Sequence, residues 1–266
     1  MPPESGPGRS RRGVHWWVRR GFLLWACGST LWLANTMRTR GVASGLMRSS
    51  ADVSVRDGDE VLAFLPVSPN GRAGLVFLCG AGVSARAYAP LLRSIADNGF
   101  SVFVVRLPYR FAPFASHKEQ ALARVNRVMA QHPGITGWVV SGHSLGAALA
   151  ARAARNDPGK FAALVLVGTT HPRDDDLSSL GLPVTKVYAT GDGVAPMERV
   201  LANRRLLPPH TMWIAIEGGN HSQFGHYGHQ LFDGRATISR EAQQGATRSA
   251  LLAALSSPVS ASTPAR

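Results

Sequence analysis

The amino-acid sequence predicts an α/β fold, in which a mostly parallel, doubly wound sheet is covered by helices on both faces. From about residue 54 onward, short apolar runs alternate with helical stretches of ten or more residues. Most of these runs are hydrophobic at nearly every position, as strands are when a parallel sheet buries both of its faces. The sequence holds no internal repeat that would favour a solenoid.

Seven strands are predicted, as short runs bounded by glycine, proline or polar residues. They cover residues 60–67, 74–80, 101–108, 137–144, 163–169, 183–189 and 211–219. In sheets of this type, ligands bind at the carboxyl ends of the strands. Candidate functional residues are therefore sought directly after each strand.

Five helical stretches lie among these strands. They cover residues 85–99, 116–134, 145–157, 196–207 and 239–255. Ser116, with Glu119 three residues later, has the pattern of a capping box, and Ser239 begins the last stretch beside an acid. The pattern predicts that both serines cap their helices.

The N-terminal region is basic and contains one apolar segment. Residues 1–50 hold eight arginines and a single acid, in a chain whose net charge is +13. The uncharged residues 21–37 follow two tryptophans. As a helix they measure about 25 Å, near the lower limit for crossing a bilayer. We expect a disordered basic segment at 1–20, a membrane or signal-anchor helix at 21–37 and a linker at 38–50.

The arginines also predict on which side of a membrane the rest of the chain lies. They are denser before residue 21 than after residue 37. The positive-inside rule then places the following domain outside the cytoplasm, anchored in or exported to a bacterial cell envelope. Arg19 and Arg20, followed by "GFLL", also resemble a twin-arginine export signal. Cleavage is left open, and an amphipathic or buried helix of a soluble protein is the alternative.

The composition excludes several classes of partner. Most of the basic excess lies before residue 51, and no basic stripe with interleaved aromatics follows, so we expect no nucleic-acid partner. Cys27 and Cys79 lie in different contexts and predict no disulfide, and no Cys/His cluster has zinc spacing. No metal and no cofactor is expected. We expect one domain at 51–256 and a disordered tail at 257–266; the oligomeric state is left open.

One motif suggests a nucleophile. Gly142-x-Ser144-x-Gly146 lies between a predicted strand and a predicted helix. This is the context of a nucleophile elbow, where glycines permit a tight turn and the helix dipole favours developing negative charge. The alternative is a tight turn with a serine N-cap. His143, beside the serine, is interpreted as elbow packing.

A serine nucleophile needs a base and an acid that orients the base. Asp192 follows the strand at 183–189, and His221 follows the strand at 211–219. The chain order Ser144, Asp192, His221 is the order expected in this architecture. Other residues compete for these roles: for the acid Asp174, Asp175, Asp176 and Asp233, and for the base His226 and His229.

The same mechanism requires an oxyanion hole. Leu145 directly follows the serine, so its backbone N–H is the first predicted donor. The second donor should come from the loop after residues 74–80, where Ala81 is the first choice and Gly82 the second. Cys79 closes that strand and is interpreted as a buried small residue, with a second nucleophile as the alternative.

Four stretches together resemble the bacterial alpha/beta hydrolase family 5 group, which is related to dienelactone hydrolases. They are "GLVFLCGAGVSARAYAPLLRSIADNGFSVFVVRLPYRFAPF", "GWVVSGHSLGAALAAR", "VYATGDGVAP" and "IEGGNHSQFGHYG" with "DGRATISREAQQ". The resemblance spans roughly residues 50–255. It implies an α/β-hydrolase fold, a triad of Ser144, Asp192 and His221, and an N-terminal membrane segment. Two features depart from the family pattern: the loop Cys79–Gly82, and Arg110 after the strand at 101–108.

These observations together predict a serine hydrolase that acts on a small carboxylic ester. Only residues 170–182 separate the strands at 163–169 and 183–189. Thirteen residues are too few for a sizeable cap, so we expect a shallow and open pocket. Two alternatives remain: a catalytically silent binding or scaffold protein on this fold, and an acyltransferase with the same triad.

Overall fold

The computed structural model describes residues 11–173 and 175–257, and the chain divides into two units, Met1–Thr36 and Met37–Arg266. In the first unit, helix α1 covers Arg11–Thr36, so residues 11–20 are helical where we expected disorder. No helix in the described residues combines the length and apolar character needed to cross a membrane, and the predicted spanning helix at 21–37 is not supported. Residues 1–10 and 258–266 of the predicted disordered ends lie outside the described residues.

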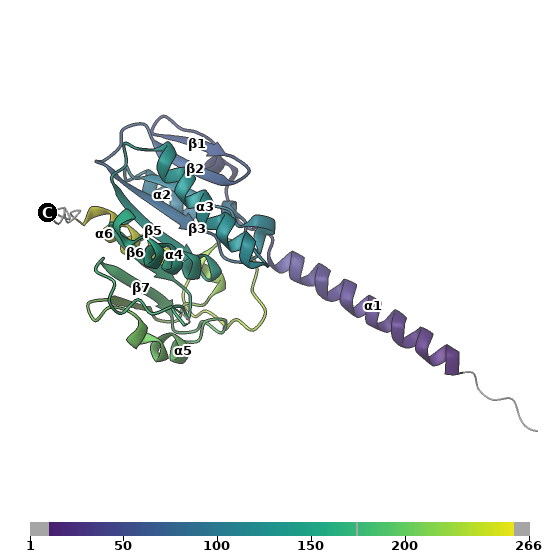
Figure 1. The fold of residues 1–266 in the computed structure, drawn as a ribbon. Coiled ribbons are helices and arrows are strands. Elements are labelled where there is room, and N and C mark those ends of the chain that lie inside the picture. Colours follow the sequence, from purple (N-terminus) through teal and green to yellow (C-terminus); the bar gives the residue numbers. More distant parts are fainter. Residues whose placement is uncertain (1–10, 174, 258–266) are drawn as a thin grey trace, which may run out of the picture. The chain divides into compact units, whose positions relative to one another are not determined.

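The second unit is built on one mixed sheet, whose strands are spread out from β1 to β7 in Figure 1. Its strand order is β1-β2-β4-β3-β5-β6-β7-β8. The strands are β1 Val53–Asp57, β2 Val61–Pro66, β3 Ala73–Leu78, β4 Ser101–Val105, β5 Gly137–His143, β6 Ala163–Val167, β7 Val184–Ala189 and β8 Met212–Ile216. From β4 to β8 all pairs are parallel, whereas β2 is antiparallel to both β1 and β4. The predicted, mostly parallel sheet is confirmed.

Strand β1 was missed by the sequence analysis. It is an edge strand, and its burial decreases steadily from Val53 to Asp57. A half-exposed strand of five residues lacks the continuous apolar run by which the buried strands were recognised. By contrast, every residue of β5 is buried, which places this strand at the centre of the core.

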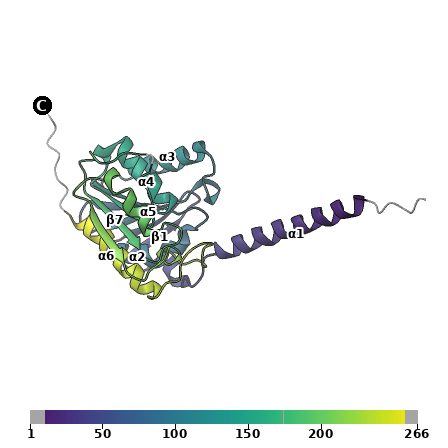
Figure 2. The ribbon, with the colours of Figure 1, turned by 90° about the horizontal axis from the view of Figure 1, so that it is seen from below.

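Helices cover both faces of the sheet, as predicted. They are α2 Ala89–Ala96, α3 Ala115–Gln131, α4 Leu145–Asn156, α5 Met197–Ala202 and α6 Arg240–Ser256. Figure 2 shows α3 and α4 on one side of the sheet and α2 and α6 on the other. The predicted cap at Ser239 is confirmed, because its hydroxyl accepts the Ala242 amide. The cap at Ser116 is wrong, because α3 begins at Ala115 and Phe114 is its N-cap.

Residues 38–50 are not a free linker. Thr39 forms an antiparallel bridge with Tyr227, and the Arg40 amide donates to the carbonyl of His226. Further along, the buried Arg93 guanidinium donates to the carbonyls of Leu46 and Arg48. This segment is therefore part of the second unit, whose boundary falls at Met37 and not at residue 51.

Candidate active site

Ser144 occupies a sharp turn between β5 and α4. Its backbone angles, φ 55° and ψ −118°, lie outside the helical region, and its amide donates to the Val167 carbonyl of β6. Such conformations cost about 1–3 kcal/mol in residues other than glycine and cluster at functional sites. Its side chain is partly exposed, although His143 beside it is buried.

The two glycines of the motif are required by close packing. A Cβ atom on Gly142 would lie 2.4 Å from the carbonyl carbon of Gly146. A Cβ atom on Gly146 would lie 2.1 Å from the Leu78 carbonyl oxygen of β3. Both distances are far below van der Waals contact, so the start of α4 presses directly against the end of β3 and places Ser144 beside the loop that follows this strand.

Asp192 and His221 are brought together from the ends of two neighbouring strands. The Asp192 turn follows β7 and the His221 loop follows β8. His221 Nδ1 lies 2.8 Å from Asp192 Oδ2, and both side chains are buried. The other carboxylate oxygen, Oδ1, accepts the amides of Val194 and Ala195 at 2.9 and 2.6 Å. The carboxylate is thus fixed by its own turn and directed at the imidazole.

The fold and this strand–turn–helix geometry can be compared with known proteins. A family model described as "Alpha/beta hydrolase family" matches residues 74–245, more than half of the chain. This chain belongs to the alpha/beta hydrolase family. No significant match exists among curated protein sequences.

Several solved structures are similar to this hydrolase. A monoacylglycerol lipase from Paleococcus ferrophilus has a TM-score of 0.57 at 14% identity, covering 76% of this chain and 99% of its own. Est1E from Butyrivibrio proteoclasticus has a TM-score of 0.55 at 12% identity, covering 77% and 99%. Esterase 2 from Thermogutta terrifontis, phosphonylated by cyclosarin, has a TM-score of 0.53 at 16% identity, covering 81% and 97%. These similarities concern the fold alone.

The competing acids of this hydrolase are engaged elsewhere. Asp175 pairs with Arg155, and Asp176 accepts the Ser178 amide at 2.9 Å; Asp174 lies outside the described residues. Of the competing histidines, His229 Nε2 lies 3.1 Å from the Asp233 carbonyl. His226 is partly buried beneath residues 40 and 41, and burial lowers its pKa. None of these side chains bonds to Asp192 or His221 in the described part of the chain.

Asp233 has a role that sequence reasoning did not assign. Its carboxylate accepts the backbone amides of His221 at 3.0 Å and Ser222 at 2.8 Å, and the Ser222 hydroxyl at 2.6 Å. It also accepts the Gly193 amide, next to Asp192, at 3.3 Å. Asp233 therefore joins the two loops that carry the acid and the histidine. The sequence gives no spacing signal for such a joint, because it depends on how the loop at 225–238 folds back.

The loop after β3 leaves one amide available. The Gly82 amide donates to the Arg110 carbonyl at 2.7 Å, so Gly82, our second choice for the oxyanion hole, is wrong as a donor. The Gly80 amide donates to the Tyr88 hydroxyl at 3.0 Å. Between them, the Ala81 amide forms no hydrogen bond in the described part of the chain, and neither does the Leu145 amide at the start of α4. These two remain the candidate oxyanion donors.

Arg110 holds this loop in place. Its guanidinium donates to the Gly82 carbonyl at 2.8 Å and to the Met37 carbonyl at 3.3 Å. Its backbone is left-handed, with φ 64°, as is that of Tyr109 with φ 51°. The two residues also line a cavity of about 310 Å³ beside the loop, together with Val83. This departure from the family pattern thus shapes the wall next to the candidate oxyanion donors.

Cys79 is not a second nucleophile. It is buried at the end of β3, and burial raises the pKa of its thiol to about 12. A thiol with this pKa carries almost no thiolate at neutral pH, and the thiolate is the reactive form. The described residues contain no group of three acids, histidines or cysteines that could hold a metal ion.

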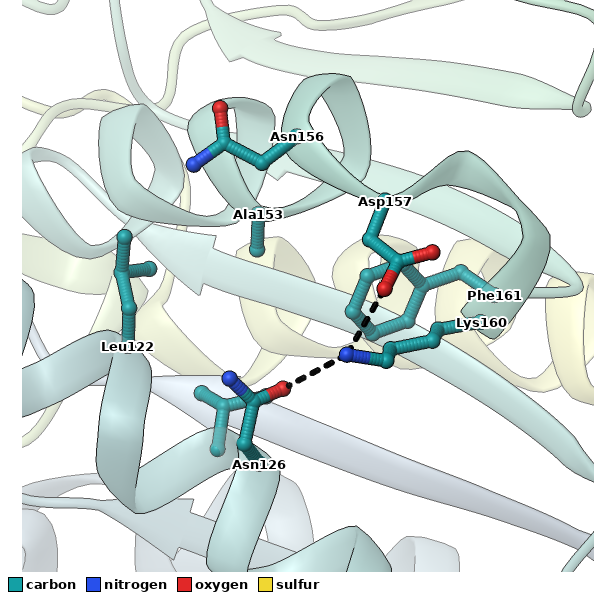
Figure 3. Close-up of a pocket in the computed structure, with 8 residues that line it drawn as sticks. Leu122, Asn126, Ala153, Asn156, Asp157, Lys160 and Phe161 are labelled. Atoms are coloured by element: carbon teal, nitrogen blue, oxygen red, sulfur yellow. Dashed lines mark hydrogen bonds and ion pairs between the residues drawn. The ribbon is translucent and has the colours of Figure 1, made fainter.

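A further cavity lies away from these residues. Figure 3 shows a space of about 210 Å³ between α3 and the end of α4, lined by Leu122, Asn126 and Ala153 among others. Lys160 lies across it, 2.7 Å from Asp157 and 3.5 Å from Asn126. Ser144 precedes the opposite end of α4, a helix of 12 residues and about 18 Å. This cavity is therefore not part of the candidate active site.

Proposed function

We propose that this protein is a serine hydrolase that cleaves carboxylic esters with Ser144 as nucleophile, His221 as general base and Asp192 as its orienting acid. The observation that carries the proposal is the buried hydrogen bond between His221 Nδ1 and Asp192 Oδ2. With Nδ1 held by the carboxylate, Nε2 is the nitrogen left to accept a proton from a serine hydroxyl.

In the proposed reaction, Ser144 Oγ attacks the ester carbonyl carbon while His221 Nε2 takes the hydroxyl proton. The carbonyl oxygen becomes an oxyanion, which the Ala81 and Leu145 amides bind. The tetrahedral intermediate collapses, the alcohol leaves with the proton from His221, and the acyl group stays on Ser144. Water then attacks the acyl-enzyme, again losing a proton to His221, and the carboxylic acid departs as the serine hydroxyl is restored.

Chemical labelling tests this proposal. A fluorophosphonate probe should modify the wild-type chain at Ser144, and Ser144→Ala should abolish both labelling and the hydrolysis of p-nitrophenyl esters. Ser116→Ala is the matched control, since Ser116 is an exposed residue of α3, and should label like the wild type. Labelling that persists in Ser144→Ala would contradict the assignment of the nucleophile.

The substrate class can be defined by measuring kcat/KM for a series of p-nitrophenyl esters whose acyl chains range from about two to about twelve carbons, because a closed pocket accepts fewer of these lengths than an open one. In the described residues, no helix or strand lies between β6 and β7, so no helical cap covers the strand ends there. We therefore expect hydrolysis of both short and longer acyl chains. Analysis of products with a competing alcohol present would separate hydrolysis from acyl transfer.

A further inference from the structure

A buried hydrogen-bonded chain connects the loop after β3 with the turn that carries Ser144. The Gly80 amide lies 3.0 Å from the Tyr88 hydroxyl, and this hydroxyl lies 2.9 Å from His143 Nδ1. Gly80 directly precedes Ala81, and His143 directly precedes Ser144. Tyr88 and His143 are both fully enclosed, at 0% and 1% exposure. Two side chains thus link the residue before the oxyanion donor to the residue before the nucleophile.

The direction of the hydrogen bonds follows from the donors available. The Gly80 N–H can only donate, so the Tyr88 oxygen accepts it. In the described part of the chain, His143 Nδ1 is the only acceptor near the Tyr88 proton, so the hydroxyl donates to Nδ1. The opposite tautomer would leave the buried hydroxyl proton without an acceptor, at a cost of about 1–3 kcal/mol. The proton of a neutral His143 therefore lies on Nε2, which forms no hydrogen bond in the described residues.

Burial keeps this imidazole neutral. Burial, and secondarily the neighbouring His221, hold the pKa of His143 well below its usual value. Nδ1 therefore remains an acceptor at neutral pH. The ring also packs beside His221, with 4.5 Å between ring centroids, and beside Phe224, with 5.4 Å. One side chain thus contacts the candidate base and is bonded, through Tyr88, to the loop that carries the Ala81 amide.

The space at Gly80 shows how closely these groups approach. A Cβ atom on Gly80 would lie 2.9 Å from His143 Nδ1 and 3.1 Å from the Tyr88 hydroxyl. The loop is held at its other side by Gly82, whose amide donates to Arg110. Ala81 lies between these two fixed points. Its N–H direction is therefore set by bonds on both sides and not by a bond of its own.

We propose that Tyr88 and His143 are positioning residues that hold the Ala81 amide at the correct distance from Ser144, and so set the geometry of the oxyanion hole. This inference rests on the proposed function and names the residues that act through its backbone donors. Neither side chain needs to touch the substrate. The oxyanion exists only in the transition state and intermediate, so their loss should lower kcat and leave KM nearly unchanged.

The first experiment compares two tyrosines. Tyr88→Phe removes the hydroxyl and keeps the ring. Tyr188→Phe is the matched control, because Tyr188 is a largely buried residue of β7 whose hydroxyl forms no hydrogen bond in the described residues. With p-nitrophenyl butyrate we expect Tyr88→Phe to lower kcat roughly 10- to 100-fold, with KM within about twofold, since misplacing an oxyanion donor costs on this order. Tyr188→Phe should retain wild-type kcat. An unchanged kcat in Tyr88→Phe overturns the proposal.

A second pair of variants separates positioning from packing. His143→Asn retains an acceptor oxygen close to the position of Nδ1, whereas His143→Leu retains only bulk. We expect the asparagine variant to keep kcat within about threefold of wild type, and the leucine variant to lose about as much as Tyr88→Phe. Equal losses in the two variants contradict the proposal. This pair also decides the matter if Tyr88→Phe fails to fold.

Amide hydrogen exchange of residues 80–82 provides a readout that needs no substrate. We expect exchange at least about tenfold faster in Tyr88→Phe or His143→Leu than in the wild type, because the Gly80 amide loses its acceptor or the acceptor loses its anchor. Unchanged exchange would overturn the proposal. A wild-type chain that hydrolyses no ester and resists fluorophosphonate would contradict the proposed function and leave this measurement unaffected.

Discussion

Two carboxylates support His221 in different ways. Asp192 bonds to the imidazole, whereas Asp233 bonds to the backbone amides of residues 221 and 222. A carboxylate that is hydrogen-bonded to the ring stabilises the imidazolium that forms during proton transfer. A carboxylate that is hydrogen-bonded to the backbone fixes the position of the residue. The two acids should therefore respond differently to the same substitution.

Asp192→Asn should reduce kcat for p-nitrophenyl butyrate by about 10²- to 10⁴-fold, because an amide favours the wrong imidazole tautomer. Circular dichroism should show a folded protein. Asp176→Asn is the matched control, since Asp176 is an exposed acid that accepts only local bonds, and should retain wild-type kcat. Activity of Asp192→Asn within threefold of wild type would remove Asp192 from the proposed triad.

Lys186 is a buried lysine without an acidic partner in the described residues. It lies on β7 between Leu166 and Trp213, and its ammonium group donates to the His171 carbonyl. It forms no ion pair in the described residues, and burial lowers its pKa to about 7. In the unfolded chain this pKa is near 10.4. At a pH between these two pKa values, Lys186 is protonated in the unfolded chain and largely neutral in the folded one, so the free energy of unfolding rises as the pH rises.

Lys186→Met should therefore raise the free energy of unfolding at pH 7 by about 1–4 kcal/mol, the range for replacing buried ions by apolar groups. It should also remove a slope of up to about 1.4 kcal/mol per pH unit between pH 7 and pH 10. Urea unfolding at pH 7, 8 and 9 measures both effects. Lys160→Met, at a half-exposed position, should leave the slope unchanged. A wild-type slope retained by Lys186→Met would refute this account.

At the scale of single residues, the sequence predicts which turns carry the candidate catalytic residues better than it predicts the hydrogen bonds that hold those turns. Ser144 and Asp192 follow the buried apolar strands β5 and β7, and His221 follows β8, an apolar edge strand that is partly exposed. All three strand ends are visible in the residue pattern. The roles of Tyr88 and Asp233 are not visible, because each depends on a contact with a distant loop. Gly82 was misjudged for the same reason: its amide is occupied by Arg110, which a left-handed turn brings near.

At the scale of elements, two serines that the sequence predicts as helix caps differ in function. Ser239 caps α6, whereas Ser116 lies inside the first turn of α3. Residues 108–112 form an irregular turn, and the chain enters α3 from it two residues earlier than the capping pattern predicts. Local pattern alone could not reveal this shift, since tertiary packing overrides helix-end signals.

Ser239→Ala should lower the free energy of unfolding by about 1 kcal/mol, the usual cost of losing an N-cap. Ser116→Ala should change it by less than about 0.5 kcal/mol, since the side chain is exposed. Chemical unfolding of both variants under one condition compares them directly. Equal losses would mean that Ser116 caps α3 after all.

The contact between α4 and β3 predicts a large effect from one added methyl group. Gly146→Ala places a Cβ atom 2.1 Å from the Leu78 carbonyl oxygen, so the elbow must shift or the chain must fail to fold. We expect a loss of at least about 3 kcal/mol, as for severe overpacking. Gly159→Ala is the control, because nothing lies within 4 Å of the new atom. Thermal unfolding that is equal for both variants would contradict the close contact.

At the scale of the whole molecule, the unit boundary sets which truncations are tolerated. Residues 37–50 provide acceptors for the buried Arg93, including Ser50 Oγ at 3.0 Å. A chain starting at Met37 should therefore unfold at the same urea concentration as the corresponding unit of the full chain. A chain starting at Ala51 should lose at least about 2 kcal/mol, since hydrogen bonds to charged groups contribute on this order. Equal stability of the two truncated chains would restore residues 38–50 as a linker.

The parallel pairing of β3 and β5 has a consequence for how this chain can vary. Leu78 pairs with Gly142, so the loop at 79–82 and the turn at Ser144 leave the sheet at the same level. One residue inserted into either strand would displace one of them by about 3.3 Å and reverse the faces of its side chains. The lengths of β3 and β5 therefore cannot change without moving the loop at 79–82 away from Ser144. The turn at Pro158–Lys160 precedes β6 at the amino ends of the strands, away from Ser144, so this constraint does not apply to its length.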